Sequence, residues 1–305
     1  MSKKSLEQKL ADGVFFLDGA MGTQLIAGGI EAGVCNEMLN VESPEIILEI
    51  HRSYFQAGSD AVLTNTFGGN GISLARHGLA DKIKQINTAA AKIAKQAADS
   101  AGSPQAGEDK YVLGDMGPSG DFLKPLGNLE PDVLKNAYAK QAKALYEAGV
   151  DGFAIETFMA IDEAEIVIEA IKSICSLPVF VSFAFDSAGK DFKTMMGASV
   201  KAIAAEISAL DITAIGFNCG TLQMEQYLGL AEKFARLLAD KDILLLAEPN
   251  AGQPELIDGK AVYKLSDTDF ANWIQKICQA GATILGGCCG TTPEHIKAMT
   301  KKLKN

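Results

Sequence analysis

The chain has 305 residues, of which 48% are apolar and 22% are charged, and its formal net charge is −10. This length allows one large α/β domain or two ordinary ones, and the composition is that of a globular protein. The acidic balance argues against nucleic acid or an anionic membrane as the main partner.

The N-terminal segment 1–13 carries charge and lacks an apolar core, so it does not predict a secretory signal. No apolar run approaches the roughly 18 residues that a membrane-spanning helix requires. We therefore expect a cytoplasmic protein with no membrane partner. Its six cysteines are then expected to be thiols or metal ligands rather than disulfides.

Eight short apolar runs rich in branched and aromatic residues recur along the chain. They are nearly continuous rather than alternating, which is typical of parallel strands buried on both faces. The predicted strands are 14–19, 61–67, 111–117, 152–157, 179–186, 214–219, 243–250 and 283–289.

Helical patterns separate these runs. One of them begins at Ser43, a predicted N-cap followed by Pro44, and ends at Gly58. The phrase helix–Ala–Gly–strand occurs three times, at Gly58, Gly149 and Gly281. We expect these glycines to adopt the left-handed conformation that ends each helix.

Eight strands alternating with helices predict an α/β fold, a single (β/α)8 TIM barrel that occupies residues 1–305 as one domain. An open doubly wound sheet is the second choice, but no G-x-G-x-x-G follows the first strand. The segment 99–110, just before the third strand, is predicted to be a surface loop.

In such a barrel the working face lies at the C-terminal ends of the strands. Polar residues and cysteines stand at these ends in the predicted pattern. They are Asp18, Asn65, Asp115, Glu156, Asn218, Cys219, Glu248, Asn250, Cys288 and Cys289.

Three of these residues, Cys219, Cys288 and Cys289, come from the sixth and eighth strands, whose ends should converge. Three thiolates on one rim match zinc, which accepts sulfur ligands in a tetrahedron. Gly286 and Gly287 would let the backbone bend so that adjacent cysteines reach one ion. A redox pair and the absence of any role remain alternatives.

The other three cysteines, in helices or a loop, are expected to be structural. No fourth cysteine and no histidine falls at a strand end. An open coordination position that receives a substrate thiol is therefore the sharper hypothesis. Zinc would keep such a thiol deprotonated at neutral pH.

The chain resembles the homocysteine S-methyltransferase family over nearly its whole length. Within the family it is most similar to the N-terminal homocysteine-binding module of cobalamin-dependent methionine synthase. The most specific motif is "GGCCGTTPEHI" at 286–296. The other matching segments are "LDGAMGTQL", "CNEMLN", "DAVLTNTFGGN", "GDMGPSG", "DGFAIETF", "GFNC" and "EPNAGQP", in that order.

The resemblance implies a (β/α)8 barrel with one zinc ion on the three strand-end cysteines, which are also the catalytic group. It implies that Asp18 and Glu156 hold the substrate ammonium and that the backbone near Gly19 and Ala20 receives the carboxylate. Asn250 matches a residue beside the metal that could fill the open position without substrate.

For three further strand-end residues the roles are less specific. Asp115 allows a structural and a functional interpretation equally. Asn65 and Asn218 are expected to brace loops or line the pocket rather than to take part in bond making.

The implied function is a zinc-dependent methyltransferase that activates homocysteine as a thiolate and methylates it to methionine. The donor could be a methylcorrinoid on a separate protein, S-methylmethionine, S-adenosylmethionine or betaine, and the acceptor could be another thiol. Segment 189–197 is bulkier than is common in the family, and its Met195 and Met196 either alter the donor pocket or pack.

Two rival functions come from other classes. A Schiff-base aldolase also favours this barrel, but none of the predicted strands ends in lysine. A zinc-stabilised binding subunit without catalysis is the second rival.

Overall fold

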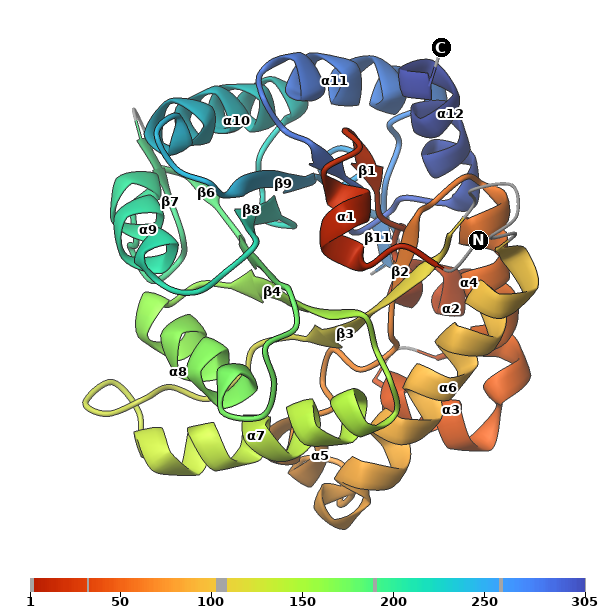
Figure 1. Ribbon diagram of the computed structural model, residues 1–305, viewed down its shortest axis with the longest axis vertical. Coiled ribbons are helices and arrows are strands. Elements are labelled where there is room, and N and C mark those ends of the chain that lie inside the picture. Colours follow the sequence, from red (N-terminus) through yellow and green to blue (C-terminus); the bar gives the residue numbers. More distant parts are fainter. Residues whose placement is uncertain (1–2, 32, 103–108, 189–190, 258–259, 305) are drawn as a thin grey trace.

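The computed structural model describes residues 3–31, 33–102, 109–188, 191–257 and 260–304. Eight parallel strands form one sheet that curls into a nearly closed barrel surrounded by helices (Figure 1). In order around the barrel, the strands are β1 (Phe15–Phe16), β12 (Ile284–Leu285), β9 (Leu244–Glu248), β8 (Ala214–Asn218), β5 (Val179–Phe183), β4 (Gly152–Phe158), β3 (Tyr111–Met116) and β2 (Ala61–Leu63).

Apart from one N-terminal helix that precedes β1, the helices follow the strands along the chain and cover the outside of the sheet. The α-helices are α1 (Leu6–Leu10), α2 (Met21–Ala27), α3 (Leu39–Glu42), α4 (Pro44–Gln56), α5 (Gly71–Ala75), α6 (Ile83–Ala101), α7 (Pro131–Glu147), α8 (Ile161–Lys172), α9 (Val200–Glu206), α10 (Met224–Leu238), α11 (Asp267–Gln279) and α12 (Pro293–Lys304). Short 3-10 helices span Asn36–Met38, Ala80–Lys82 and Ile207–Ala209.

The barrel closes between β1 and β2, which are the two ends of the sheet order. The Asp60 backbone N–H, just before β2, donates to the Phe16 carbonyl of β1 at 2.7 Å. The Asp60 carboxylate also accepts from the Phe16 N–H at 3.0 Å. These two contacts take the place of a regular ladder at the seam.

The predicted barrel is confirmed, and each of the eight predicted strands overlaps an observed one; β4 extends one residue beyond its predicted end. The glycines expected at the helix ends have positive φ, 106° at Gly58, 85° at Gly149 and 116° at Gly281. Pro44 is the first residue of α4, although the Ser43 side chain makes no capping hydrogen bond. In the predicted loop 99–110, residues 103–108 lie outside the described part of the chain.

Two antiparallel hairpins were not predicted. One joins β6 (Asp186–Ala188) to β7 (Asp191–Lys193), and the other joins β10 (Glu255–Ile257) to β11 (Lys260–Val262). They follow β5 and β9 and therefore extend the loops on the C-terminal side of the barrel.

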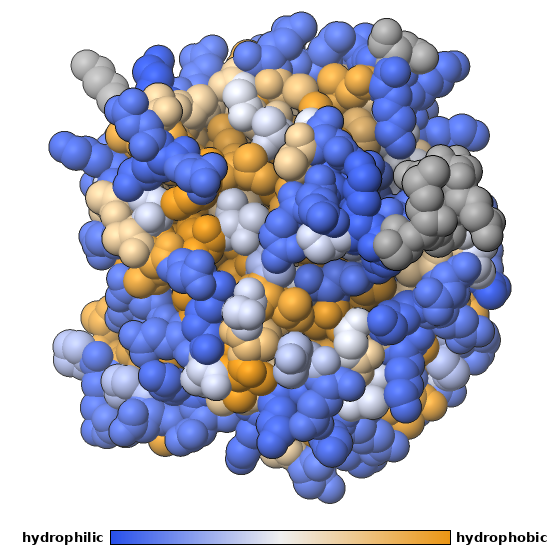
Figure 2. Space-filling view, in the orientation of Figure 1, coloured by the Kyte–Doolittle hydropathy of each residue, from blue (hydrophilic) through white to orange (hydrophobic). Residues whose placement is uncertain are grey.

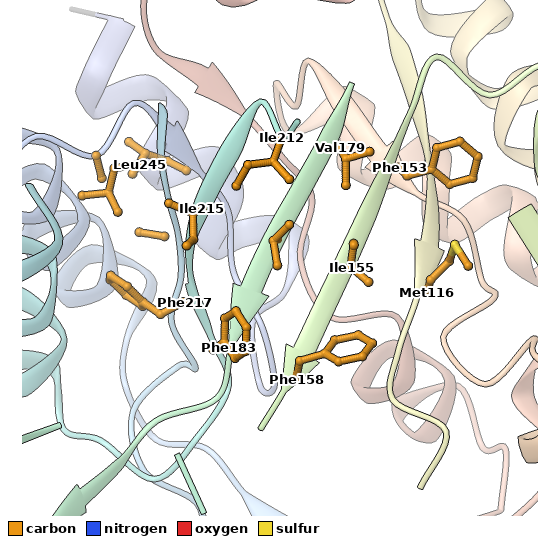
Figure 3. Close-up of a cluster of buried hydrophobic side chains, with 14 of the residues drawn as sticks. Met116, Phe153, Ile155, Phe158, Val179, Phe183, Ile212, Ile215, Phe217 and Leu245 are labelled. Carbon is orange, nitrogen blue, oxygen red and sulfur yellow. The ribbon is translucent and has the colours of Figure 1, made fainter. Parts of the chain in front are cut away.

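The core has two layers. Outward-facing side chains of the strands pack under the helices, and Figure 3 shows part of this layer on β3, β4, β5, β8 and β9. An inner cluster fills the barrel and includes Phe15, Tyr111 and Phe180. Leu6 and Leu10 of α1 belong to this inner cluster, so α1 plugs the barrel at the N-terminal ends of its strands.

Figure 1 looks onto this plugged pole, with α1 in front of the strands. The same view coloured by hydropathy shows hydrophilic residues over α1 (Figure 2). The last turn of α12 reaches the same pole, because Lys304 Nζ donates to the Gly58 carbonyl at 3.2 Å. No helix among the described residues is long and apolar enough to cross a membrane.

Candidate active site

A cavity of about 280 Å³ opens at the C-terminal ends of the strands. Its lining comes from the ends of β1, β2, β3, β4, β8, β9 and β12 and the loops that follow them. The lining residues are Asp18, Gly19, Ala20, Met21, Gly22, Thr23, Asn36, Glu37, Leu63, Thr64, Asn65, Phe67, Asp115, Glu156, Thr157, Cys219, Glu248, Gly287, Cys288 and Cys289.

The three predicted metal ligands converge in this cavity. The Cys219 and Cys289 sulfurs are 3.8 Å apart and those of Cys288 and Cys289 are 4.0 Å apart. All three sulfurs lie within 4.8 Å of one another. A tetrahedral zinc ion with bonds of about 2.3 Å holds two sulfurs about 3.8 Å apart, so the donor set fits a metal ion of that kind.

Local backbone geometry places these sulfurs. Cys219 directly follows β8 and has a φ of 51°, one of two positive values at non-glycine residues in the described chain. The Cys288 N–H donates to the Pro249 carbonyl at 3.0 Å, and the Cys289 carbonyl accepts from Ala251 N–H at 2.9 Å. The loop after β12 is thereby tied to the loop after β9, which lies between β8 and β12 in the sheet.

Hydrogen bonds among the thiols shift the pKa values of Cys288 and Cys289 in opposite directions. Cys289 accepts hydrogen bonds from Cys219 and then Cys288, which lowers its pKa to about 3. The pKa of Cys288 is raised, first by its hydrogen bonds to Cys219 and Cys289 and then by burial. The thiol pKa values thus shift in opposite directions within the cluster. Metal binding would displace the thiol protons.

Tyr263, from the segment after β11, also reaches this cluster. Its hydroxyl lies near Cys289 and helps to lower the pKa of that thiol. Its ring covers Gly290, where a Cβ atom would lie 2.1 Å from the ring carbon Cγ. Nothing in its sequence context, a short polar stretch, predicts this contact.

Four carboxyl groups stand beside the sulfurs. Asp18, Asp115 and Glu248 are at most 5% exposed, and Glu156 is partly exposed toward the cavity. Burial raises the pKa of Glu156 to about 7, and the nearby Cys289 adds to this shift. Burial is also the main reason why the pKa values of the other three lie well above their usual range.

Asn218 connects the carboxylates to the sulfurs. Its Nδ2 donates to Glu156 Oε2 and to Thr157 Oγ1, both at 2.7 Å, and lies 3.6 Å from Cys288 Sγ. Its Oδ1 accepts from the Thr157 N–H at 2.8 Å, and Thr157 is the other non-glycine residue with positive φ in the described chain. Asn218 thus fixes the Glu156 carboxylate beside the thiols, a closer role than the brace expected from sequence.

Of the other expected substrate contacts, some line the cavity and one does not. Gly19 and Ala20 line the cavity, but the Ala20 N–H already donates to Thr291 Oγ1 at 3.1 Å. Asn250 is buried behind the cavity rather than in its lining. Its Nδ2 donates to the Gly220 carbonyl, while its Oδ1 has no hydrogen-bond partner among the described residues.

Residues expected to be structural lie away from the sulfur cluster. Cys35 is buried and donates to Glu37 Oε2 at 3.3 Å, and Cys278 lies on α11. His51 is buried in α4, where burial lowers its pKa to about 3. His295 bonds to the Leu265 carbonyl in front of α11.

Asn65, the remaining strand-end asparagine, braces a loop as expected. Its Nδ2 donates to the Asn36 carbonyl at 2.7 Å and to Asn40 Oδ1 at 3.2 Å. Beside it, Glu37 accepts the Gly68 N–H and also lines the cavity. Sequence reasoning did not single out Glu37, although it belongs to the "CNEMLN" motif.

Comparison with known sequences gives two results. The family model of homocysteine S-methyltransferase matches residues 15–303. Methionine synthase of Mycobacterium tuberculosis is 34% identical over 97% of this chain and 25% of its own length, and that of Mycobacterium leprae is 35% identical over 96% and 24%. The chain therefore spans about a quarter of the length of these relatives.

Solved structures give the same result. The metallated form of the homocysteine methyltransferase MmuM from Escherichia coli superposes with a TM-score of 0.79 at 25% identity, covering 98% of this chain and 99% of that one. A methyltransferase from Methanosarcina mazei, at 14% identity and a TM-score of 0.56, shares the fold.

The resemblance noted in the sequence is thus confirmed. The barrel agrees with the fold of these structures. The chain belongs to the homocysteine S-methyltransferase family.

Proposed function

We propose that this chain uses a zinc ion on Cys219, Cys288 and Cys289 to transfer a methyl group to homocysteine and form methionine. One observation carries the proposal: three sulfurs at tetrahedral spacing share one small cavity with a group of carboxylates. In such a cavity, the thiol of an α-amino acid would bind the metal ion and its ammonium group would bind the carboxylates. Zinc bound there would supply a Lewis acid that keeps a fourth sulfur deprotonated at neutral pH.

The carboxylates Asp18 and Glu156 would bind the substrate ammonium. Asp18 Oδ2 is held by the Leu63 N–H at 3.1 Å, and Glu156 Oε2 is held by Asn218. The substrate carboxylate would lie against the backbone at Gly19 and Ala20, where the Ala20 N–H would exchange its present partner, Thr291.

Asn250 is proposed to occupy the open metal position before substrate arrives. One support is its buried Oδ1, which lacks a hydrogen-bond donor among the described residues. The other is the neighbouring residue Ala251, whose N–H donates a hydrogen bond to the Cys289 carbonyl. An amide oxygen is a weak ligand compared with a thiolate, so homocysteine would displace it.

Methyl transfer then needs orientation more than proton transfer. A bond forms between the homocysteine sulfur and the methyl carbon while the bond from that carbon to the donor breaks, and the electron pair leaves with the donor. The cavity holds the thiolate in line at the mouth of the barrel, so no protein nucleophile or general base is required.

The donor is proposed to be a methylcorrinoid carried by a separate protein or module, on the similarity to methionine synthases. S-methylmethionine, S-adenosylmethionine and betaine are the alternatives. Met196 lines a second, apolar pocket between the loops after β3, β4 and β5, and Met195 beside it is 74% exposed. These methionines could therefore contact a donor that approaches the mouth.

We also propose that residues 1–305 act as one homocysteine-binding module and that the protein is cytoplasmic. The six cysteines are all free, which fits a reducing compartment.

The metal assignment is tested on the purified protein. Wild type should contain about one zinc ion per chain, because three thiolates converge, and Cys288→Ala should lose it. Cys278→Ala, which removes a thiol from α11, should retain the metal. Full zinc retention by Cys288→Ala would show that the ligands are different.

The catalytic assignment is tested by methionine formation from homocysteine with each donor in turn, including a methylated corrinoid protein. We expect transfer from at least one donor and none after chelation of the metal. The absence of transfer from every donor would refute catalysis by this chain and favour the non-catalytic binding subunit.

A further inference from the structure

The cavity contains more carboxyl groups than two ammonium contacts explain. Five carboxyl-bearing residues line it, and its described lining includes no lysine, arginine or histidine. Most of these carboxylates already have donors from the protein. Glu37 accepts from Gly68 and Cys35, Asp18 from Leu63, and Glu156 from Asn218.

Asp115 differs from these carboxylates. It is the next-to-last residue of β3, is 5% exposed, and lines the cavity. Its Oδ1 is buried and accepts no hydrogen bond from any described residue. Leaving a buried acceptor unpaired costs stability, so a carboxylate kept in this state points to a missing donor.

The backbone of Asp115, by contrast, is fully built into the protein. Its N–H donates to Thr64 Oγ1 at 3.0 Å, and its carbonyl accepts from Thr66 Oγ1 at 2.7 Å and from Gln141 Nε2 at 3.4 Å. The two threonine hydroxyls are bonded to each other at 2.6 Å. This buried network fixes the backbone position of Asp115, while its Oδ1 has no hydrogen-bond donor among the described residues.

The Asp115 carboxyl also lies beside the proposed ammonium ligands. Asp18 and Glu156 line the same cavity. Burial has the larger effect in raising the pKa of Asp115, and the charges of Glu156 and Asp18 raise it further. An ammonium group has three N–H donors, so Asp115 can accept one of them while Asp18 and Glu156 accept the others.

We propose that Asp115 is a third ligand of the substrate ammonium and determines the preference of this site for a thiol that carries an α-amino group. This inference rests on the proposed binding of homocysteine in the cavity. Asp18, Glu156 and Asp115 then each accept one N–H of the same ammonium, and the unpaired Oδ1 gains its donor.

The test compares two thiols that differ only in the ammonium, L-homocysteine and 4-mercaptobutanoate. Calorimetric titration of zinc-loaded wild type and Asp115→Asn gives both dissociation constants for each protein. Asparagine keeps the shape of the side chain and removes its charge. We expect homocysteine to bind Asp115→Asn about 10-fold more weakly or worse, and 4-mercaptobutanoate to bind with little change.

Two further variants serve as controls. Asp121→Asn removes an exposed carboxylate that pairs with Arg76 outside this cavity, and it should leave both constants unchanged. Asp115→Glu keeps the charge and should retain a preference for homocysteine over 4-mercaptobutanoate in the folded protein. The preference is a ratio within one protein, so a general loss of folding does not change it.

The outcomes separate the two proposals. A wild type that binds neither thiol overturns the proposed function and this inference with it. A wild type that binds homocysteine, with an Asp115→Asn variant that keeps the same preference, overturns the inference alone. A loss confined to homocysteine supports it.

Discussion

Asn218 joins the two halves of the candidate site through one side chain. It holds the Glu156 carboxylate, both polar groups of Thr157, and a position near the Cys288 sulfur. Because Asn218 is completely buried, each of these groups would lose a partner that water replaces poorly. The amide therefore sets the distance between the ammonium ligands and the thiols.

Replacing Asn218 by alanine is expected to weaken binding of homocysteine and to lower the free energy of unfolding by about 1–3 kcal/mol, since buried acceptors lose their donor. Urea unfolding and calorimetric titration measure the two effects. Asn272→Ala, on the exposed face of α11, serves as the matched control and should change neither. Unaltered homocysteine affinity in Asn218→Ala would exclude the bridging role.

Tyr263 supports the proposed metal ligand Cys289 from outside the proposed ligand set. Partners of this kind typically change metal affinity about 10–100-fold when they are removed. We therefore expect Tyr263→Phe to release zinc to a competing chelator more readily than wild type. Tyr146→Phe, which removes an exposed hydroxyl on α7, should behave as wild type does. Equal zinc affinity in all three proteins would mean that the hydroxyl is dispensable.

At this scale the sequence predicted the residues that lie at strand ends and missed those that arrive from elsewhere. The three cysteines follow β8 and β12, so the barrel alone makes them converge. Tyr263 comes from a hairpin segment 26 residues before Cys289, and its contact depends on the path of a loop. Periodicity and strand ends carry no information about that path.

Among the elements, the turn after β12 shows how the backbone limits side chains. Gly290 has a φ of 81°, and a Cβ there would meet the Tyr263 ring at 2.1 Å. Two costs therefore fall on one position, a left-handed backbone and a collision with the ring. The loop that carries two metal ligands can close only with glycine at this point.

Gly290→Ala should consequently cost more stability than the left-handed backbone alone, roughly 2 kcal/mol or more. The comparison is Gly78→Ala, which has a φ of 70° and open space around the added methyl, and should lose only about 1 kcal/mol. Thermal unfolding of both variants measures the difference. Equal losses would show that the Tyr263 ring moves aside freely.

The elements themselves were predicted with uneven success for a physical reason. The eight barrel strands are apolar on both faces, a pattern that buried parallel strands require. The hairpins β6/β7 and β10/β11 have three residues in each strand and contain charged side chains such as Asp191, Lys193, Glu255 and Lys260. Such short, polar strands are held by their surroundings, so no periodic signal marks them.

For the molecule as a whole, the buried carboxyl groups impose a pH dependence on stability. Burial raises the pKa of Glu248 well above its ordinary 4.5, and the charges of Glu156 and Asp18 raise it further. The folded protein therefore holds this proton at pH values where the unfolded chain has lost it. Stability falls as pH rises from about 4.5 through the raised pKa of the folded state.

Glu248→Gln removes this penalty. In metal-free protein the variant should exceed wild type in unfolding free energy at pH 8, on the order of 1 kcal/mol or more, and by much less at pH 5. Glu232→Gln, on the exposed face of α10, should show no such trend. Chemical denaturation at both pH values measures the difference in unfolding free energy between variant and wild type. An equal difference at pH 5 and pH 8 would contradict the proposed coupling between Glu248 protonation and stability.

The plugged pole of the barrel has a consequence for any covalent neighbour. Helix α1 and the end of α12 both lie at that pole, and the cavity opens at the other. Helix α12 has 12 residues, which corresponds to roughly 18 Å along its axis. A linker attached at this pole must span at least that distance to reach the cavity mouth. About six fully extended residues are therefore the minimum for a fused donor module. Shortening such a linker would switch off transfer within one polypeptide while leaving transfer between separate polypeptides intact.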